Sequence, residues 1–164
     1  WNKVADAQGY EIEQYDAKTK TWKQVSTAKS TSSTIKKLKT ATSYTYRVRA
    51  YRKSGSTVIN GNYSSSVKTA TAPARPALKA KKKGSSQVQL NWKRVKGAGG
   101  YEVQMRKNKG GYKRIKTLSK GSSIKYIKKN LKRGSYGFRV RVYVKVGSKK
   151  VYSGYSAVKK VVVR

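Results

Sequence analysis

Residues 1–15, WNKVADAQGYEIEQY, and residues 92–106, WKRVKGAGGYEVQMR, are two versions of one pattern. Each begins with Trp, has Val three residues later, and continues after a glycine with Tyr, Glu and an aliphatic residue. The second version starts 91 residues after the first. A repeat at such an interval indicates that one structural unit occurs twice in the chain.

The repeat extends over almost all of the 164 residues. Shifts of 90 to 93 residues superpose its landmarks, which are Tyr10 on Tyr101, Leu38 on Leu131, Tyr44 on Tyr136, Tyr46 on Phe138, Val48 on Val140 and Tyr51 on Tyr143. The sequence therefore predicts one domain over residues 1–72 and a second over residues 77–164. Residues 73–76 lie between them, and the two prolines of this stretch favour an extended, stiff linker.

Apolar and polar residues alternate with a period of two within each unit. Val88, Leu90 and Trp92 alternate with polar residues, and so do the aromatic and aliphatic residues of YGFRVRV, residues 136–142. This alternation is typical of antiparallel strands that bury one face, and no stretch has a convincing helical period. Several short strands in a unit of about 90 residues predict an all-β fold, a β-sandwich in each unit.

The order of these landmarks resembles that of fibronectin type III domains, which are immunoglobulin-like β-sandwiches. The resemblance implies two tandem sandwiches, with Trp1, Trp92, Tyr44 and Tyr136 as structural core residues. The Lys-rich sequence with GYEV and YRVRAY phrases is similar to modules of Gram-positive surface and secreted proteins. That similarity implies an extracellular or cell-wall-associated location.

The first copy begins at the Trp that the second copy reaches only after residues 77–91. Those residues provide the first strand of the second sandwich and the start of the next. We therefore expect the first sandwich to lack its N-terminal strand, and the parent protein to continue before Trp1.

Composition excludes several kinds of chemistry. The chain has no Cys and no His, so disulfides, thiolate nucleophiles and imidazole bases are ruled out, and no metal or cofactor is expected. No apolar run approaches the length of a membrane helix. The 41 basic and 5 acidic residues give a net charge of +36. This excess repels itself in a compact domain, so the fold needs a good core, a low-charge interior or an anionic neighbour.

Glu11 and Glu13 are the only pair of acids with a spacing that merits a catalytic hypothesis. They lie two apart on a predicted strand, at roughly 7 Å, which falls within the separation of an inverting glycosidase pair. The alternative is cross-strand pairing with Arg47 and Arg49, which the family topology places beside them. We favour pairing, because Gln104 stands where a repeated pair would need a second acid.

The basic charge is concentrated in the second unit. Residues 73–164 contain 28 of the basic residues and one acid, Glu102. Alternation predicts that Glu102, Gln104, Arg139 and Tyr143 point outward, and that basic residues gather on the same sheet and at its hairpin end. The predicted site for an anionic polymer comprises Arg106, Arg139, Arg141, Lys145, Lys149 and Lys150.

Three classes of function remain open. The first is a non-catalytic spacer or adhesion module of a larger protein, which contacts anionic cell-wall polymers or acidic glycans. The second is nonspecific nucleic-acid binding, which the charge permits although no recognition motif is present. The third is an accessory role beside a wall- or glycan-degrading catalytic domain elsewhere in the parent chain. The sequence does not indicate an oligomeric state.

Overall fold

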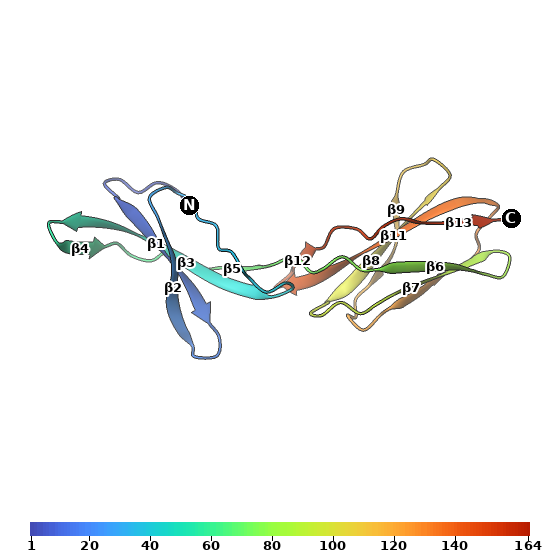
Figure 1. Ribbon diagram of the computed structural model, residues 1–164, viewed down its shortest axis with the longest axis horizontal. Helices are drawn as coiled ribbons and strands as arrows, with labels where there is room; N and C mark the ends of the chain where they lie inside the picture. Colours follow the sequence, from blue (N-terminus) through green and yellow to red (C-terminus); the bar gives the residue numbers. More distant parts are fainter. The chain divides into compact units, whose positions relative to one another are not determined.

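The computed structural model describes residues 1–164 and contains only β-structure (Figure 1). The chain forms two compact units. The first comprises residues 1–39 and 43–70, and the second comprises residues 40–42 and 71–164. Pro73 and Pro76, which we expected in a linker, are buried and belong to the second unit. The structure has no helix of the length and hydropathy that a membrane crossing requires.

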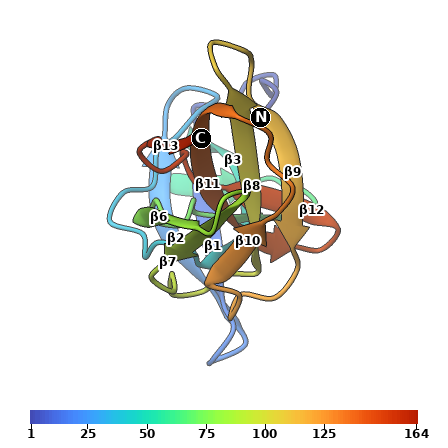
Figure 2. The ribbon, with the colours of Figure 1, turned by 90° about the vertical axis from the view of Figure 1, so that its right-hand side faces the viewer.

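The second unit is a sandwich of two antiparallel sheets (Figure 2). One sheet has the order β12-β11-β8-β9, with β13 also paired to β11, and the other has the order β10-β7-β6. Its strands are β6 (Leu78–Lys83), β7 (Gln87–Trp92), β8 (Gly100–Lys107), β9 (Lys113–Leu118), β10 (Lys125–Lys128), β11 (Gly134–Val146), β12 (Lys149–Tyr152) and β13 (Lys159–Val163).

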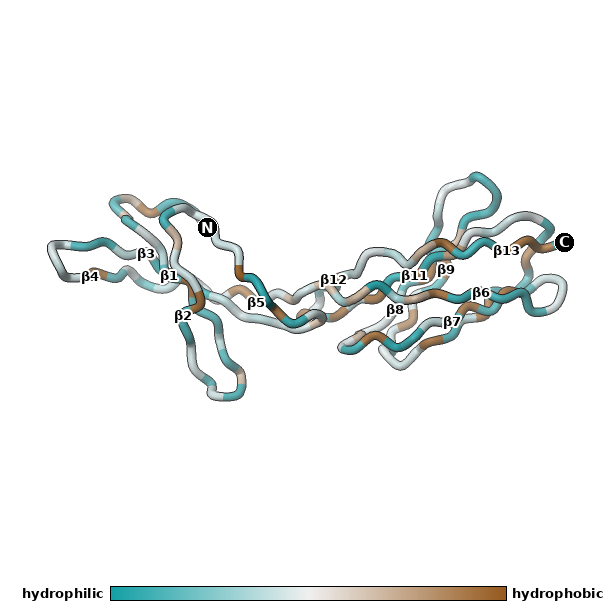
Figure 3. The backbone as a smooth tube through the Cα atoms, in the orientation of Figure 1, coloured by the Kyte–Doolittle hydropathy of each residue, from teal (hydrophilic) through white to brown (hydrophobic).

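The core of the second unit lies between these sheets. Polar and apolar residues alternate along β7 and over the first residues of β6 (Figure 3), and the apolar residues face the opposite sheet. Trp92 and Tyr136 are buried, with exposed fractions of 4% and 3%. The other core residues are Leu78, Val88, Leu90, Tyr101, Val103, Leu131, Phe138, Val140, Val142 and Val163.

The first unit has one sheet, with the order β2-β1-β3-β4 and with β5 also paired to β3. This sheet corresponds, strand for strand, to the large sheet of the second unit. Its strands are β1 (Gly9–Asp16), β2 (Thr21–Ala28), β3 (Ser43–Ser54), β4 (Thr57–Asn60) and β5 (Val67–Ala70). The first unit is thus an all-β domain without the N-terminal strand, as predicted, and its second layer is not formed as a sheet.

Trp1 does not lie in a core, contrary to our expectation. Its exposed fraction is 39%, although its ring still contacts that of Tyr10 at a centroid distance of 5.3 Å. Trp92 is covered because β7 pairs with β6 on one side and β10 on the other. Residues 29–42 form no strand, so no equivalent layer covers Trp1.

Tyr44 is likewise half-buried rather than part of a closed core. Its hydroxyl accepts a hydrogen bond from the backbone N–H of Lys39 at 2.9 Å. In the second unit the hydroxyl of Tyr136 donates to the carbonyl oxygen of Lys132 at 2.7 Å, and the ring is enclosed. A hollow of about 400 Å³, lined by residues that include Ile12 and Leu38, remains on the uncovered side of the first sheet.

Candidate anion-binding face of the second unit

The outward face of the large sheet is organised by the pairing of β8 with β11. Arg139 lies opposite Gln104, and Arg141 lies opposite Glu102. Arg139 donates from Nε and Nη2 to Gln104 Oε1, at 2.9 and 2.7 Å. Arg141 donates from Nε to Glu102 Oε1 at 3.0 Å, and its Nη2 lies 2.9 Å from the same oxygen. Directly opposed positions of an antiparallel pair share a face, so the register itself creates both contacts.

Tyrosine rings alternate with these arginines along the face. The Arg139 guanidinium lies 3.9 Å from the ring centroids of both Tyr112 and Tyr155. Arg141 lies 3.8 Å from the Tyr152 ring and 4.8 Å from the Tyr155 ring. Each guanidinium therefore has aromatic rings beside it as well as a hydrogen-bonding partner, and the short distances to the rings favour cation–π attraction. We call Arg139, Arg141, Tyr112, Tyr152 and Tyr155 the arginine–tyrosine ladder.

Glu102 is enclosed beneath this ladder, with an exposed fraction of 2%. Burial by itself would raise the pKa of its carboxyl, but the hydrogen bond and charge of Arg141, helped by Tyr155 and Gln104, outweigh burial and lower the pKa. The Tyr155 hydroxyl donates to Oε1 at 3.1 Å, and Arg114 lies 4.0 Å from Oε2. The single acid of the second unit is therefore ionised and already satisfied.

The first unit has the same kind of face, built from arginines and two carboxylates. Arg47 Nη2 lies 2.7 Å from Glu13 and Arg49 Nη2 lies 2.7 Å from Glu11, and the Tyr63 ring covers Arg47 at 3.7 Å. The predicted cross-strand pairing is thus confirmed. Burial raises the pKa of Glu13, but hydrogen bonds from Tyr63 and Arg47 and the arginine charges lower it overall. Each carboxylate is held by an arginine across the strands, so neither is free to protonate a leaving group, and the alternative of a sugar-cleaving pair is not supported.

The six basic residues predicted to bind an anion all lie on the large sheet of the second unit, but they occupy three separate places on it. Three lysines lie at the hairpin end, two arginines lie in the middle, and Arg106 lies at the other end. Lys145 and Lys150 are opposite each other across β11 and β12, next to Lys149, and all three are exposed. Arg106 lies opposite Gly137, and Gly137 is eight residues before Lys145 on β11. Eight residues of strand span roughly 26 Å, so Arg106 and the three lysines cannot hold one small anion together.

The middle section is less available than the sequence suggested. Arg139 and Arg141 are half-buried in the ladder, and their hydrogen-bonding edges face Gln104 and Glu102. Tyr143, which we expected to point to solvent, is 1% exposed because it packs over Gly100 and against the Tyr152 ring, at a centroid distance of 5.5 Å. Periodicity predicted which side of the strand these residues occupy, but it could not show that neighbouring rings cover them.

Two lysines near Arg106 were missed by sequence reasoning. Lys109 and Lys160 line the same surface hollow as Arg106, beside Gly137. Lys160 reaches it because β13 pairs with β11, which places Lys160 opposite Gly137. The sequence feature that could have indicated the hollow is Gly137, the one glycine among the outward residues of YGFRVRV. Glycine within a strand often marks a point where a ligand or another backbone comes close.

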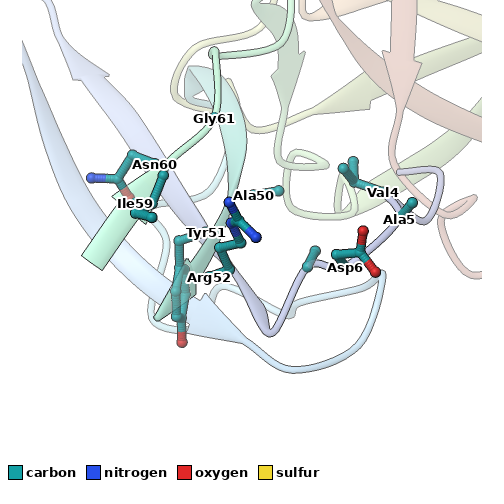
Figure 4. Close-up of a pocket in the computed structure, with 10 residues that line it drawn as sticks. Val4, Ala5, Asp6, Ala50, Tyr51, Arg52, Ile59, Asn60 and Gly61 are labelled. Carbon is teal, nitrogen blue, oxygen red and sulfur yellow. The ribbon is translucent and has the colours of Figure 1, made fainter. Parts of the chain in front are cut away.

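The remaining hollows offer little that resembles a catalytic site. Figure 4 shows one in the first unit, of about 180 Å³, where Val4 and Asp6 lie across from Tyr51, Arg52 and Ile59. Its lining has one carboxylate, that of Asp6, and no second acid that could act as its partner in proton transfer. Nowhere do three or more acidic side chains gather as metal ligands.

Comparison with known proteins gives matches at the level of structure. No protein-family model matches the sequence, and no curated protein matches it. The crystal structure of the FN1–FN3 domains of chicken CNTN1 is 20% identical, with a TM-score of 0.50, and the match covers 95% of this chain and 54% of that one. The chain thus spans about half the length of that structure. A crystal structure of titin domains A168–A170 is also 20% identical, with a TM-score of 0.47, and that match covers 73% of this chain and 40% of the titin chain.

The strand order and the CNTN1 likeness together define the class of protein. The chain has a fibronectin type III-like, all-β fold in two tandem units. Similarity at this level of identity establishes the fold and leaves function to be argued from the surface.

Proposed function

We propose that the chain is a non-catalytic tandem module of an extracellular or cell-wall-associated protein, and that its second unit binds an anionic polymer. The polymer class that fits best is an anionic cell-wall polymer or an acidic glycan. The tandem domains would serve as a spacer for the rest of a larger parent protein. The similarity of the sequence to Gram-positive surface modules supports this setting.

The observation that carries the proposal is the absence of internal partners for the positive charge. Of the 28 basic residues in residues 73–164, only Arg114 and Arg141 form an ion pair, and both contact the same buried Glu102. Arg139 donates to the neutral Gln104 and so keeps its full charge on this face. Mutual repulsion among the basic residues costs free energy in a compact domain, and a polyanion that binds across them relieves that cost.

The exposed hairpin between β11 and β12 is the part of the surface best suited to first contact. Lys145 and Lys150 lie opposite each other on one face of the hairpin, Lys149 lies on its other face beside the turn, and Lys150 is held over the Tyr143 ring at 4.5 Å. A Debye length of about 8 Å under physiological salt lets such a cluster act on a flexible polymer as one charge. We call these three residues the hairpin lysines.

The test is a binding comparison between matched variants. Lys145→Gln, Lys149→Gln and Lys150→Gln together should weaken binding of the chain to teichoic acid or a sulfated glycan by roughly tenfold, since each such contact contributes to affinity. The control replaces Lys79, Lys81 and Lys83, exposed residues of β6 on the other sheet, and so removes the same net charge.

Equal losses in the two triple variants would overturn the proposed face, because only net charge would then matter. Double-stranded DNA is included at the same charge concentration as the wall polymer and the glycan. Tighter binding to DNA than to either polymer would replace the proposal with nonspecific nucleic-acid binding. Unchanged affinity in both variants would refute polymer binding through either surface.

A further inference from the structure

The surface hollow beside Gly137 has the features of a site for a single anionic group. It holds about 350 Å³ and is lined by Arg106, Asn108, Lys109, Ser135, Gly137 and Lys160. Three of these six residues are cations, and none is an acid. We call it the Gly137 hollow, and it is separate from the hairpin lysines at the opposite end of the sheet.

Strand register explains why two of these cations flank a residue that has no side chain. Gly137 on β11 lies opposite Arg106 on β8 and opposite Lys160 on β13. The three residues therefore form one row across three neighbouring strands, with a side chain at each end and none in the middle. Adjacent strands are about 4.8 Å apart, so the two cationic residues are rooted about 10 Å from each other, a gap that one multi-oxygen anion can bridge.

A side chain at position 137 would press on two of the groups beside the hollow. A Cβ atom built on Gly137 would lie 3.1 Å from Arg106 Nε and 3.1 Å from the Tyr112 hydroxyl oxygen. That hydroxyl is buried and has no hydrogen-bond partner. A buried polar group without a partner costs free energy, so an unpaired donor stands next to Arg106, beside the hollow.

The rim of the hollow is ordered by the turn after β8. Asn108 has φ of 52°, its N–H donates to the carbonyl oxygen of Ser135 at 2.6 Å, and its Oδ1 accepts from the N–H of Ser135 at 3.1 Å. These two hydrogen bonds fix the turn that carries Lys109 against the start of β11. The Arg106 guanidinium is in turn placed by the Tyr112 ring, 5.2 Å away.

The first unit provides an internal comparison. The position equivalent to Gly137 is Thr45, which lies opposite Lys68 on β5, and the position equivalent to Arg106 is Tyr15. This row has one cation and a side chain at its centre. The hollow is therefore a property of the second unit alone, although both units share the same strand order.

We propose that the Gly137 hollow is a subsite for one phosphate or sulfate group, bound by Arg106, Lys109 and Lys160. Several charge-assisted hydrogen bonds can converge on the oxygens of such a group, which suits its tetrahedral shape. The inference deepens the proposed function, because the group would be one unit of the anionic polymer. The inference rests on the proposed function only in naming the polymer that supplies the phosphate or sulfate group. The subsite itself can be tested with a free anion.

The experiment is an amide NMR titration of the whole chain with inorganic phosphate and, separately, with inorganic sulfate, at constant ionic strength kept with sodium chloride. We expect saturable shifts at residues 106–109, 135–137 and 160 with at least one of the anions, and weaker, non-saturating shifts at the hairpin lysines. Saturation by phosphate alone would indicate a phosphate polymer, and saturation by sulfate alone would indicate a sulfated glycan. Absence of saturable shifts at these residues with both anions would overturn the subsite.

Gly137→Thr copies the first unit into the second and leaves the charge unchanged. It should weaken anion binding at the hollow by at least about tenfold, the effect of losing one or two charge-assisted contacts. Thr45→Gly is the reciprocal control and should leave anion binding at the hollow unchanged. If Gly137→Thr does not fold, as its spectrum would show, Lys160→Gln provides the same test without filling the hollow.

The outcome for the subsite is independent of that for the proposed function. Saturable phosphate or sulfate binding without any polymer binding would retain the subsite and refute the proposed function. Polymer binding that depends on the hairpin lysines, without saturation at the hollow, would retain the proposed function and refute the subsite. Full-strength anion binding by folded Gly137→Thr and Lys160→Gln would also refute the subsite.

Discussion

Replacement of Arg141 by Met tests the energetic role of the arginine–tyrosine ladder. The side chain of Glu102 is 3% exposed, and its Oε1 accepts hydrogen bonds from Arg141, Tyr155 and Gln104. Met retains much of the hydrophobic contact with the rings but leaves a buried carboxylate without its cation. Removal of one partner from a buried pair typically costs about 3–5 kcal/mol.

The free-energy cost at Glu102 should fall at or just below the lower end of that range. Tyr155 and Gln104 still donate to Oε1 after the substitution, and Arg114 remains near Oε2 at 4.0 Å. The Arg141 side chain is also 26% exposed, so solvent already screens part of the interaction. We therefore expect Arg141→Met to reduce the free energy of unfolding of the second unit by about 2–3 kcal/mol.

The equivalent change in the first unit is the matched control. Glu11 has a 17% exposed side chain and pairs with Arg49 at 2.7 Å, so Arg49→Met should cost about 1 kcal/mol or less. The assay is urea unfolding followed through amide signals assigned to each unit, so that the two transitions are read separately. A double-mutant cycle with Glu102→Gln then isolates the coupling, which we expect to be at least about 1.5 kcal/mol.

A coupling at Glu102 and Arg141 of no more than about 0.5 kcal/mol would contradict this reasoning, because the pair would then behave as an exposed surface pair. Equal losses for Arg141→Met and Arg49→Met would contradict it as well, since the argument depends on the deeper burial of Glu102. The cycle uses Gln at position 102 because Gln keeps the shape of Glu and removes only its charge.

The pKa values of Glu102 and Glu13 are lowered, because arginine and tyrosine contacts outweigh burial. Each ionised carboxylate therefore stabilises the fold at pH values above the ordinary pKa of 4.5, and this stabilisation is lost as the pH falls below 4.5. Urea unfolding across the acid range should show this loss, and Glu102→Gln should flatten it in the second unit. Trp92→Ala should cost the second unit about 3–5 kcal/mol. Trp1→Ala should cost the first unit about 1 kcal/mol or less, because Trp1 is 39% exposed; comparable losses at both tryptophans would refute the open first layer.

The fold was predictable from sequence wherever burial follows alternation within one strand. Val88, Leu90 and Trp92 are all buried on one face of β7, as their spacing indicates. Trp1 matches Trp92 in the repeat but lies outside any strand and is 39% exposed, because no second sheet covers it. Similar local sequences thus reach different levels of burial because their long-range partners differ.

The candidate site was predictable only as a set of outward cations. Cross-strand pairing could be anticipated, because the distance from Arg47 to Glu13 follows from the strand order, and the contact is present at 2.7 Å. The tyrosine rings that cover the arginines could not be anticipated, since Tyr155 lies 53 residues from Glu102 and approaches it from the segment after β12. A side chain that points outward from a sheet is exposed only if no later segment crosses it, and crossing segments leave no periodic signal.

The two units show how the charge of such a face can change while its packing is kept. In the first unit two arginines meet two carboxylates, whereas in the second Gln104 replaces the equivalent of Glu13. Gln104 Oε1 still accepts two hydrogen bonds from Arg139, at 2.9 and 2.7 Å, and the ring of Tyr155 still lies 3.9 Å from the guanidinium. The amide thus preserves the geometry of the ladder and removes one negative charge beneath it. The positive potential of the second face is higher as a result, which adds one charge to the larger cation excess on which the proposed anion binding rests.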